Sequence, residues 1–514
     1  MALGPMDFNL QSAPGTDCVT AKNVLIISPR LAIQKGDFLG SGVPYWPLEA
    51  AIFASVWRES YWEVSILDLF GMDPARLTAD GSLYWQGMPL QEAVSNRAIR
   101  LQDYDWVLVY AISCMSHQEL LGIVKSLKSL SARHVVVFEN SQAVTGYDLT
   151  ETIPFYKEAG ADYLLIGEPY SNWEKLKGFF DGTASAPPAN LIDLHAASPV
   201  PAKRFTQNPI HTPVPAWDLF PFENYWKLPY SHGPKKAPYF PMLTSRGCPY
   251  PCTFCVVPAT NEQRWRARSA EEVVAEMVNL HHKYGVLEFQ WEDLNSTIDR
   301  ARVQAIGHLL VEKKLPFRFR LVSGTKVETL DVPTLDAMAE GGCDYISISP
   351  ESGSPQILQK MRKPFDHAHA LQMVKAMHER GIHSQACFVL GHPEETEADR
   401  AATESYVKQM VRAGVDEVAF FILSPLPGSA LQNAMPYGNY EEALWSFSPR
   451  HRTDYKVLEK WRQRLIRRFF FWKLVFKPGA LLRQMWNAFV GRPFTKMEML
   501  PRRVLYILRA TKSS

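Results

Sequence analysis

The run Thr244-Ser-Arg-Gly-Cys-Pro-Tyr-Pro-Cys-Thr-Phe-Cys255 directly follows a strand-like segment, 239–243. It spaces Cys248, Cys252 and Cys255 as C-x3-C-x2-C. Three thiolates can hold three corners of a cubane [4Fe-4S] cluster and leave the fourth iron open to a small molecule. The alternative is a zinc site, which needs a fourth Cys or His at close spacing. His281 and His282 lie too far along a predicted helix, so the run favours an iron-sulfur site.

Downstream of this run the chain repeats a strand-then-helix pattern. A capping box, Ser269-Ala-Glu-Glu272, predicts the start of the first helix, and later helices are expected to begin near Asp299 and Thr396. The apolar runs predict six strands, at 239–245, 286–291, 317–322, 344–349, 384–390 and 415–423. Six such units indicate an open (β/α)6 partial barrel over 239–430 rather than a closed eight-unit barrel.

Upstream, residues 22–170 alternate in the same way, and this half is expected to be α/β as well. Continuous apolar runs predict five strands buried on both faces, at 23–28, 62–67, 106–110, 134–138 and 162–166. Helices expected at 47–59, 117–130 and 147–159 supply right-handed crossovers, which gives a doubly wound, flavodoxin-like sheet over 21–180. Residues 181–238 are rich in proline and predict a linker, 1–20 a tail, and 431–514 a helical region.

Phe254 completes the sequence C-x3-C-x-aromatic-C, and at this point the chain resembles the radical S-adenosylmethionine (SAM) enzymes. Further matches follow the later strands, in Glu351-Ser-Gly-Ser354, 387–396 and 424–429, although Cys387 stands where the family has Gly and Ser349-Pro350 where it has Gly-Ile. The resemblance implies that SAM contacts Phe254, Glu292, Asp293, Glu351, Ser352, Val389 and Gly391. A purely structural role, as a helix-capping acid, stays open for Glu292 and Asp293.

The five-stranded half is similar to the cobalamin-binding domain found in one branch of that superfamily. In a doubly wound sheet, ligands bind outside the carboxyl ends of the strands. Here those ends carry Ser28, Ser113, Gly167 and Glu168, which are the expected cobalamin contacts. Glu139-Asn-Ser-Gln142 replaces the Gly-Gly turn of the family, and no Asp-x-His-x-x-Gly follows the first strand. His195 is interpreted as a linker residue, so cobalamin is expected to lack a histidine ligand from this protein.

Together these resemblances imply a cobalamin-dependent methyltransferase that uses SAM, a [4Fe-4S] cluster and methylcobalamin. Its substrate would be an unactivated carbon, or a phosphorus, of a small metabolite or lipid, and its reductant a one-electron carrier such as flavodoxin or ferredoxin. Two alternatives stay open: a related cyclase or oxidoreductase without methyl transfer, and a non-catalytic corrinoid or iron-sulfur binding module. A methylthiotransferase would carry a second cysteine set, which Cys18 and Cys114 cannot provide.

Charge is distributed unevenly along the chain. The net charge is +2, yet 450–514 holds 17 lysines and arginines against 3 acids. This basic, aromatic region could contact an anionic membrane surface, but we favour packing of its aromatic side on an acidic body. Two roles stay equally open for the arginines around the cysteine run, namely SAM or cluster contacts and ion pairs between domains; they are Arg246, Arg264, Arg266 and Arg268.

Composition narrows the location and the partners. Seven cysteines, mostly scattered, are typical of a reducing compartment rather than of a disulfide framework. The first twenty residues lack the apolar segment of a secretory signal, and no stretch is apolar enough to span a membrane, so a cytoplasmic protein is expected. No zinc-finger or RNA-binding signature is present, and no nucleic-acid partner is expected.

Overall fold

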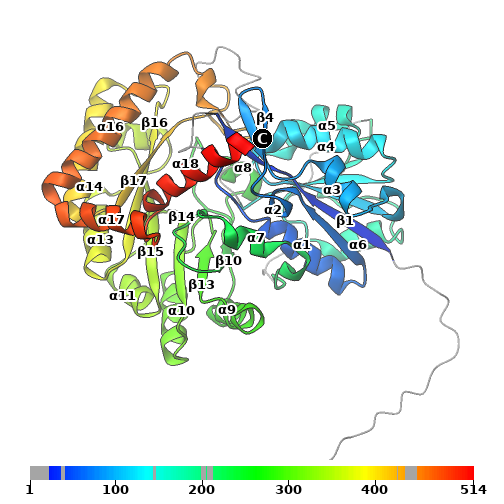
Figure 1. The fold of residues 1–514 in the computed structure, drawn as a ribbon, viewed down its shortest axis with the longest axis horizontal. Coiled ribbons are helices and arrows are strands. Elements are labelled where there is room, and N and C mark those ends of the chain that lie inside the picture. Colours follow the sequence, from blue (N-terminus) through cyan, green and yellow to red (C-terminus); the bar gives the residue numbers. More distant parts are fainter. Residues whose placement is uncertain are drawn as a thin grey trace, which may run out of the picture.

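The computed structural model describes residues 22–35, 41–142, 146–197, 204, 212–424, 426–434 and 448–513. The expected tail at 1–20, with Cys18, lies outside the described residues, as does Pro425 of the 424–429 match. The two predicted α/β halves lie side by side, and the C-terminal helices run across the second half (Figure 1).

The first half is the predicted doubly wound sheet. Its strands have the order β3-β1-β6-β7-β8-β9, all parallel except the last. The strands are β1 (Asn23–Ser28), β3 (Glu63–Asp68), β6 (Trp106–Ala111), β7 (Val135–Glu139), β8 (Tyr163–Leu165) and β9 (Leu191–Asp193). Alternate residues of one strand enter two separate cores; Leu108 packs on one face and Val107 on the other. The sheet is therefore buried on both faces, as the apolar runs predicted.

Helices cover both faces of this sheet. They are α1 (Leu48–Glu59), α2 (Leu69–Met72), α3 (Leu90–Asn96), α4 (His117–Ser129), α5 (Ile153–Ala159) and α6 (Trp173–Phe180). A small antiparallel sheet of β2 (Leu31–Gln34), β5 (Leu83–Gln86) and β4 (Leu77–Asp80) adjoins them. The sequence did not predict this sheet, nor did it predict β9, which is three residues long and lies inside the expected linker.

The second half is a six-stranded parallel sheet in sequential order, β10-β13-β14-β15-β16-β17. These strands are β10 (Tyr239–Met242), β13 (Glu288–Trp291), β14 (Arg318–Thr325), β15 (Cys343–Glu351), β16 (His383–Leu390) and β17 (Glu417–Ile422). The helices between them are α8 (Val257–Asn261), α9 (Ala270–Tyr284), α10 (Arg300–Glu312), α11 (Val332–Glu340), α12 (Pro355–Lys360), α13 (His367–Glu379) and α14 (Glu397–Ala413). Ser269, Asp299 and Thr396 cap α9, α10 and α14, which confirms the three predicted helix starts.

Three C-terminal helices complete the chain: α16 (Tyr455–Phe476), α17 (Pro478–Val490) and α18 (Lys496–Ser513). The buried side of α16, which includes Leu465, Phe469 and Trp472, packs on the second half, as we favoured for this region. Among the described residues, no helix has the length and apolar character needed to cross a membrane.

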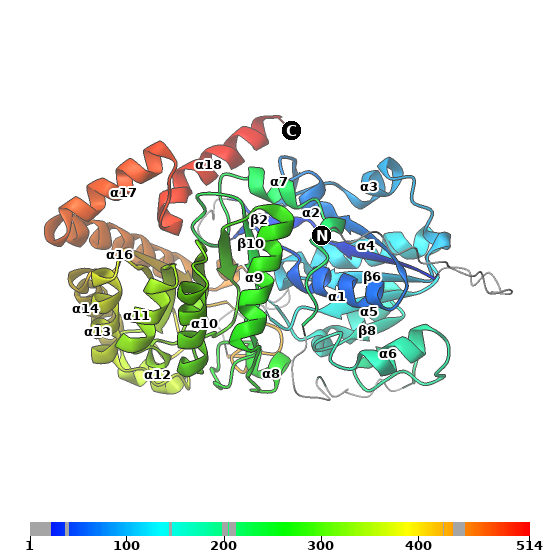
Figure 2. The same cartoon turned by 90° about the horizontal axis from the view of Figure 1, so that it is seen from below.

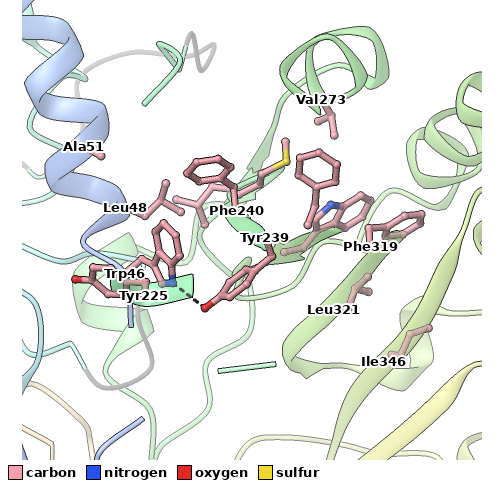
Figure 3. Close-up of a cluster of buried hydrophobic side chains, with 14 of the residues drawn as sticks. Trp46, Leu48, Ala51, Tyr225, Tyr239, Phe240, Val273, Phe319, Leu321 and Ile346 are labelled. Carbon is pink, nitrogen blue, oxygen red and sulfur yellow. Dashed lines mark hydrogen bonds between the residues drawn. The ribbon is translucent and has the colours of Figure 1, made fainter. Parts of the chain in front are cut away.

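One continuous apolar core joins the two halves (Figure 3). Trp46, just before α1, packs against Tyr225 of α7 (Phe222–Lys227) with ring centroids 4.6 Å apart. Its indole nitrogen also donates a hydrogen bond of 2.7 Å to the hydroxyl of Tyr239, the first residue of β10. Because the two halves share one apolar core, their two sheets are held in a fixed position relative to each other.

Candidate active site

The cysteine loop lies at the carboxyl end of β10. A two-residue ladder of β11 (Ser245–Arg246) and β12 (Arg266–Ala267) closes its base. The backbone N–H of Thr253 donates to the carbonyl of Met361 at 3.0 Å, which fixes the loop against the end of α12. The loop thus lies where parallel α/β sheets place their reactive groups.

The three thiols are partly buried and close enough to influence one another. Burial raises the pKa of Cys252 to about 11 and that of Cys255 to about 12; the neighbouring cysteines act in the same direction, and Lys363 opposes them. Within the described ranges, no three His, Cys, Asp or Glu side chains are gathered around a point for a single metal ion. A cubane cluster gives each cysteine its own iron, so three such ligands need not surround a single point.

Two lysines border the cysteines, and no sequence motif indicated either of them. Lys363 pairs with Glu351 at 2.5 Å and lies over the Phe254 ring, 6.0 Å from its centroid. Lys326 lies 5.1 Å from the centroid of the Tyr250 ring. Both lysines lower the pKa of Cys252, so their charge favours the thiolate form that binding of iron would require.

Two of the predicted SAM residues, Phe254 and Val389, lie together beside the cysteines, and two others shape nearby turns of the sheet. Phe254 and Val389 belong to one small apolar cluster, which also contains Ile357, Met361 and Leu423. Gly391 follows β16 with a φ of +84°, and its N–H donates to Glu395 at 3.0 Å. Ser352 is buried, and its hydroxyl lies 3.2 Å from that of Thr403 on α14. The structure thus places Val389 against Phe254 of the cysteine loop, whereas Gly391 shapes the turn after β16 and Ser352 supports the turn between β15 and α12.

Glu292 and Asp293, adjacent in sequence, have different surroundings. The buried carboxylate of Asp293 accepts hydrogen bonds from the N–H and hydroxyl groups of Thr244 and Ser245, just before the cysteines. Such a fully bonded carboxylate holds the loop in place, as a structural acid would.

Glu292 instead faces a polar cluster in the second half, the (β/α)6 partial barrel. Its carboxylate lies 2.5 Å from Nδ1 of His232, whose ring packs at 4.8 Å from Tyr45 of the first half. Lys496, from α18, adds a nearby positive charge, and burial lowers its pKa. Burial also lowers the pKa of His232, while Glu292 acts in the opposite direction. Tyr45, His232 and Lys496 come from distant segments, so sequence spacing could not have grouped them.

The first half has a pocket where its strand order reverses, between β1 and β6. The predicted cobalamin residues Ser28 and Ser113 both line it, together with Arg30, Tyr45 and Tyr225. In a sheet of this order the reversal point is the general site for ligands. The ring of Tyr45 also packs against His232, so this side chain connects the lining of the pocket with the polar cluster of the barrel.

Gly167 and Glu168 lie at another part of this edge, in an ion-pair layer between the halves. The N–H of Gly167 donates to Glu139 at 2.8 Å. The buried carboxylate of Glu168 is held by Arg266, with one contact of 2.8 Å, and Arg246 pairs with Glu49 of α1 at 2.6 Å. Arg246 and Arg266 therefore join the two halves, which is the structural role left open for them.

The remaining two arginines stay within the second half. Arg268 forms a buried pair with Glu276 of α9, and the more exposed Arg264 lies 3.5 Å from Glu262. His195 lies just beyond β9, and its Nε2 contacts Asp162 at 3.0 Å.

The comparisons agree with this geometry. Residues 242–407 match the family described as the radical SAM superfamily. This chain contains a radical SAM domain. The radical SAM domain comprises the cysteine loop and strands β13 to β16, together with the residues predicted to contact SAM.

Curated relatives share part of the chain. It is 30% identical over 231 residues to an uncharacterized methyltransferase of Pyrococcus horikoshii, covering 45% of this chain and 48% of that protein. It is 30% identical over 233 residues to the cytidylyl-2-hydroxyethylphosphonate methyltransferase of Streptomyces wedmorensis, covering 43% and 42%. The chain thus spans about half the length of the curated relatives it matches.

A solved structure extends the likeness to both halves. The radical SAM methyltransferase TsrM from Kitasatospora setae, with cobalamin and a [4Fe-4S] cluster bound, aligns with a TM-score of 0.59 at 17% identity. The alignment covers 81% of this chain and 78% of that one. The arrangement of a doubly wound sheet before a radical SAM sheet is therefore shared with TsrM as a fold.

Proposed function

We propose that this chain is a cobalamin-dependent radical SAM methyltransferase. The observation that carries the proposal is the meeting of two sites. The cysteine loop lies at the end of β10, and Tyr45, which lines the pocket at the β1/β6 reversal, packs against His232 of the polar cluster beside Glu292. Two relatives are named methyltransferases, and the similar TsrM structure holds both cobalamin and a cluster.

The proposal assigns each group of residues a role in binding the cluster or SAM. Cys248, Cys252 and Cys255 bind three irons of the cluster as thiolates, favoured by Lys363 and Lys326. Glu292 accepts hydrogen bonds from the amino group of SAM, and Glu351 from its ribose hydroxyls. Phe254, Val389 and Gly391 pack against its adenine. When bound, the cluster supplies the electron that splits SAM into methionine and a 5'-deoxyadenosyl radical, and cobalamin supplies the methyl group.

The proposal also assigns roles to the residues that were predicted to contact cobalamin. Ser28 and Ser113 contact cobalamin at the reversal pocket. Glu168, whose carboxylate is bound by Arg266, positions the two halves, and Gly167 shapes the turn beside it. The substrate would be a small metabolite or lipid methylated at carbon or phosphorus, and a flavodoxin or ferredoxin would supply electrons.

The test measures iron and cobalt per chain after anaerobic purification from cells supplied with cobalamin. We expect about four irons and about one cobalt for one cluster and one corrinoid. Ser113→Leu fills the reversal pocket and should lower cobalt but not iron; Ser129→Leu, on the exposed side of α4, should lower neither. Iron without cobalt in the unmodified protein would leave the SAM chemistry but remove methylcobalamin from the proposal.

Product analysis separates the alternatives. Strong reduction of the loaded protein with SAM should yield 5'-deoxyadenosine; its absence would favour a non-catalytic binding module. A product heavier than its substrate by one methyl group supports methyl transfer. A product that has lost hydrogen without that gain would indicate the cyclase or oxidoreductase instead.

A further inference from the structure

Helix α17 has its polar side turned inward and its apolar side outward. Its buried residues are Gln484 and Asn487, whereas Trp486 is 63% exposed and Phe489 80% exposed. A surface helix of a globular protein normally shows the opposite arrangement. The exposed side chains therefore call for a partner outside the described residues.

Specific hydrogen bonds fix this orientation. Gln484 accepts from Lys473 of α16 at 2.6 Å and donates to the carbonyl of Asp416 at 3.1 Å. Asn487 donates to Glu498 of α18 at 3.2 Å. Rotating α17 to bury Trp486 would break all three bonds inside the protein, so the outward apolar side is built into the packing.

The neighbouring helices extend the same surface. α17 packs between the end of α16 and α18, and Figure 2 shows α17 and α18 along one edge of the molecule with no other element outside them. We call nine of the exposed apolar side chains of the three helices the C-terminal apolar face. They are Phe471, Leu474, Val475, Leu482, Met485, Trp486, Phe489, Leu505 and Leu508.

Arginines flank this face on each helix. Residues three or four apart share one side of a helix. Arg467 thus adjoins Phe471, Arg483 adjoins Trp486, and Arg502 adjoins Leu505, and all three arginines are exposed. The described part of α16–α18 contains two acids, Glu459 and Glu498, and these pair with Arg462 and bond to Asn487. The face therefore combines apolar side chains with positive charge that nearby acids do not offset.

The apolar side chains and the positive charge together distinguish between two possible partners of this face, a second copy of the chain and a lipid bilayer. In a symmetric pair of copies the same patch would meet itself, bringing the arginines of one face near those of the other without acids between them. An anionic bilayer accepts both parts, since aromatic and aliphatic side chains enter the headgroup boundary and arginines pair with phosphates. We propose that the C-terminal apolar face seats this protein on an anionic lipid bilayer.

Helix α18, which carries part of the C-terminal apolar face, is hydrogen-bonded directly to the barrel. The backbone N–H groups of Lys496 and Met497, at the start of α18, donate to Glu417 of β17 at 3.1 and 2.6 Å. The ammonium group of Lys496 donates to the carbonyl of Val322 at 2.7 Å. The helices that contact the bilayer therefore hold the barrel at its surface. This inference goes beyond the proposed methyl transfer and does not depend on it.

The test is co-sedimentation of the full chain with vesicles of phosphatidylcholine alone and of an equimolar mixture with phosphatidylglycerol. We expect binding to the mixed vesicles, weakened by salt, and little to the neutral ones. The double variant Trp486→Ser/Phe489→Ser should lower the affinity by about tenfold or more. Arg467→Gln/Arg483→Gln should lower it by about tenfold or more at low salt, at roughly fivefold for each charge.

Matched controls are Tyr61→Asn and Arg97→Gln, which change exposed residues of the first half and should leave vesicle binding unchanged. All four variants should keep the iron content and thermal unfolding of the parent, which separates this test from that of the proposed function. Absence of binding, or equal binding by the Trp486/Phe489 variant, would overturn the proposal. So would a dimer in sedimentation that this variant dissociates, because the face would then join two copies.

Discussion

The helices of the two α/β halves begin in different ways. In the second half, side chains of Ser269, Asp299, Asp331, Ser354, Asp366 and Thr396 accept hydrogen bonds at the starts of α9 to α14. In the described part of the first half, no side chain caps the starts of α1, α3, α4, α5 or α6. The barrel thus satisfies its helix N-termini from its own sequence, and the first half does so less.

This difference bears on where ligands can bind. Capped N-termini have amide groups that are already engaged, so the barrel must hold its ligands through thiols, carboxylates and an apolar wall. In the first half, a 3-10 turn, Cys114–Ser116, leads into α4, and Ser113 and Ser116 both line the β1/β6 pocket. The N–H groups of Met115 and His117 are already bonded within this turn, to the Ser113 hydroxyl and the Cys114 carbonyl, so the pocket where we propose cobalamin presents hydroxyl side chains. The two edges are thus suited to different kinds of contact.

The strongest way to separate the halves is to remove the cluster ligands. Cys252→Ala should abolish 5'-deoxyadenosine formation and most of the bound iron, because a cluster held by two cysteines is not retained. Cobalt content should stay unchanged, since the reversal pocket does not involve the cysteine loop. Iron and cobalt analysis of one preparation checks both expectations.

Cys114→Ala provides the control, since it removes a buried free thiol of the first half and should leave iron at the parent level. If Cys252→Ala lost cobalt together with iron, the two sites could not be treated as independent.

The next largest effect concerns the junction. Arg246→Met would leave Glu49 buried without its arginine, while Glu168 would keep Arg266, and breaking a buried pair costs about 3–5 kcal/mol of unfolding free energy. Arg58→Met breaks the exposed pair with Asp218 and should cost about 1 kcal/mol or less. Urea unfolding of both variants measures the difference. Equal losses would show that the buried layer contributes no more than a surface ion pair.

Much of the fold could be predicted because its signals are local. The apolar runs of β1, β6 and β7 and the caps at Ser269, Asp299 and Thr396 each lie within one short segment. β9 was missed because three residues carry little periodicity, and the sheet of β2, β4 and β5 because four-residue strands do not stand out from loops.

Sequence motifs brought part of the candidate site together, and the binding roles of its residues stay predictions. The cysteines, Phe254 and Val389 meet as expected. Lys363 and His232 were not foreseen, because their positions beside Cys252 and Glu292 arise only from tertiary packing. Asp293 shows another limit of prediction from sequence. An acid that only supports the fold and an acid that binds a ligand look alike in sequence.

Helix α2 is an exception in the first half, because the side chain of Asp68 caps its start. A pH experiment tests the protonation of this side chain. Burial raises the pKa of Asp68 to about 6 from 3.8, although Tyr225 and Gly71 donate to its carboxylate and lower it. The folded protein therefore keeps a proton that the unfolded chain releases between these values. This contribution to stability is present below pH 4 and is lost as the pH rises through about 6.

Asp68→Asn removes this titration while keeping an acceptor for the N–H of Gly71. Above pH 6 the variant should be more stable than the parent by up to about 3 kcal/mol, and the gap should close toward pH 4. Urea midpoints of both proteins across this range measure the gap. A gap that does not change with pH would show that Asp68 has an ordinary pKa.

The smallest effect tests the helix starts directly. Ser269→Ala removes the reciprocal capping box of α9, in which Ser269 and Glu272 bond to each other's backbone, and should cost about 1 kcal/mol. Ser116→Ala changes the corresponding position of α4, where no side-chain cap is formed, and should cost less than about 0.5 kcal/mol. Urea unfolding of the pair measures the contrast. Equal costs would mean that Ser116 stabilises the start of α4 as strongly as the capping box stabilises the start of α9.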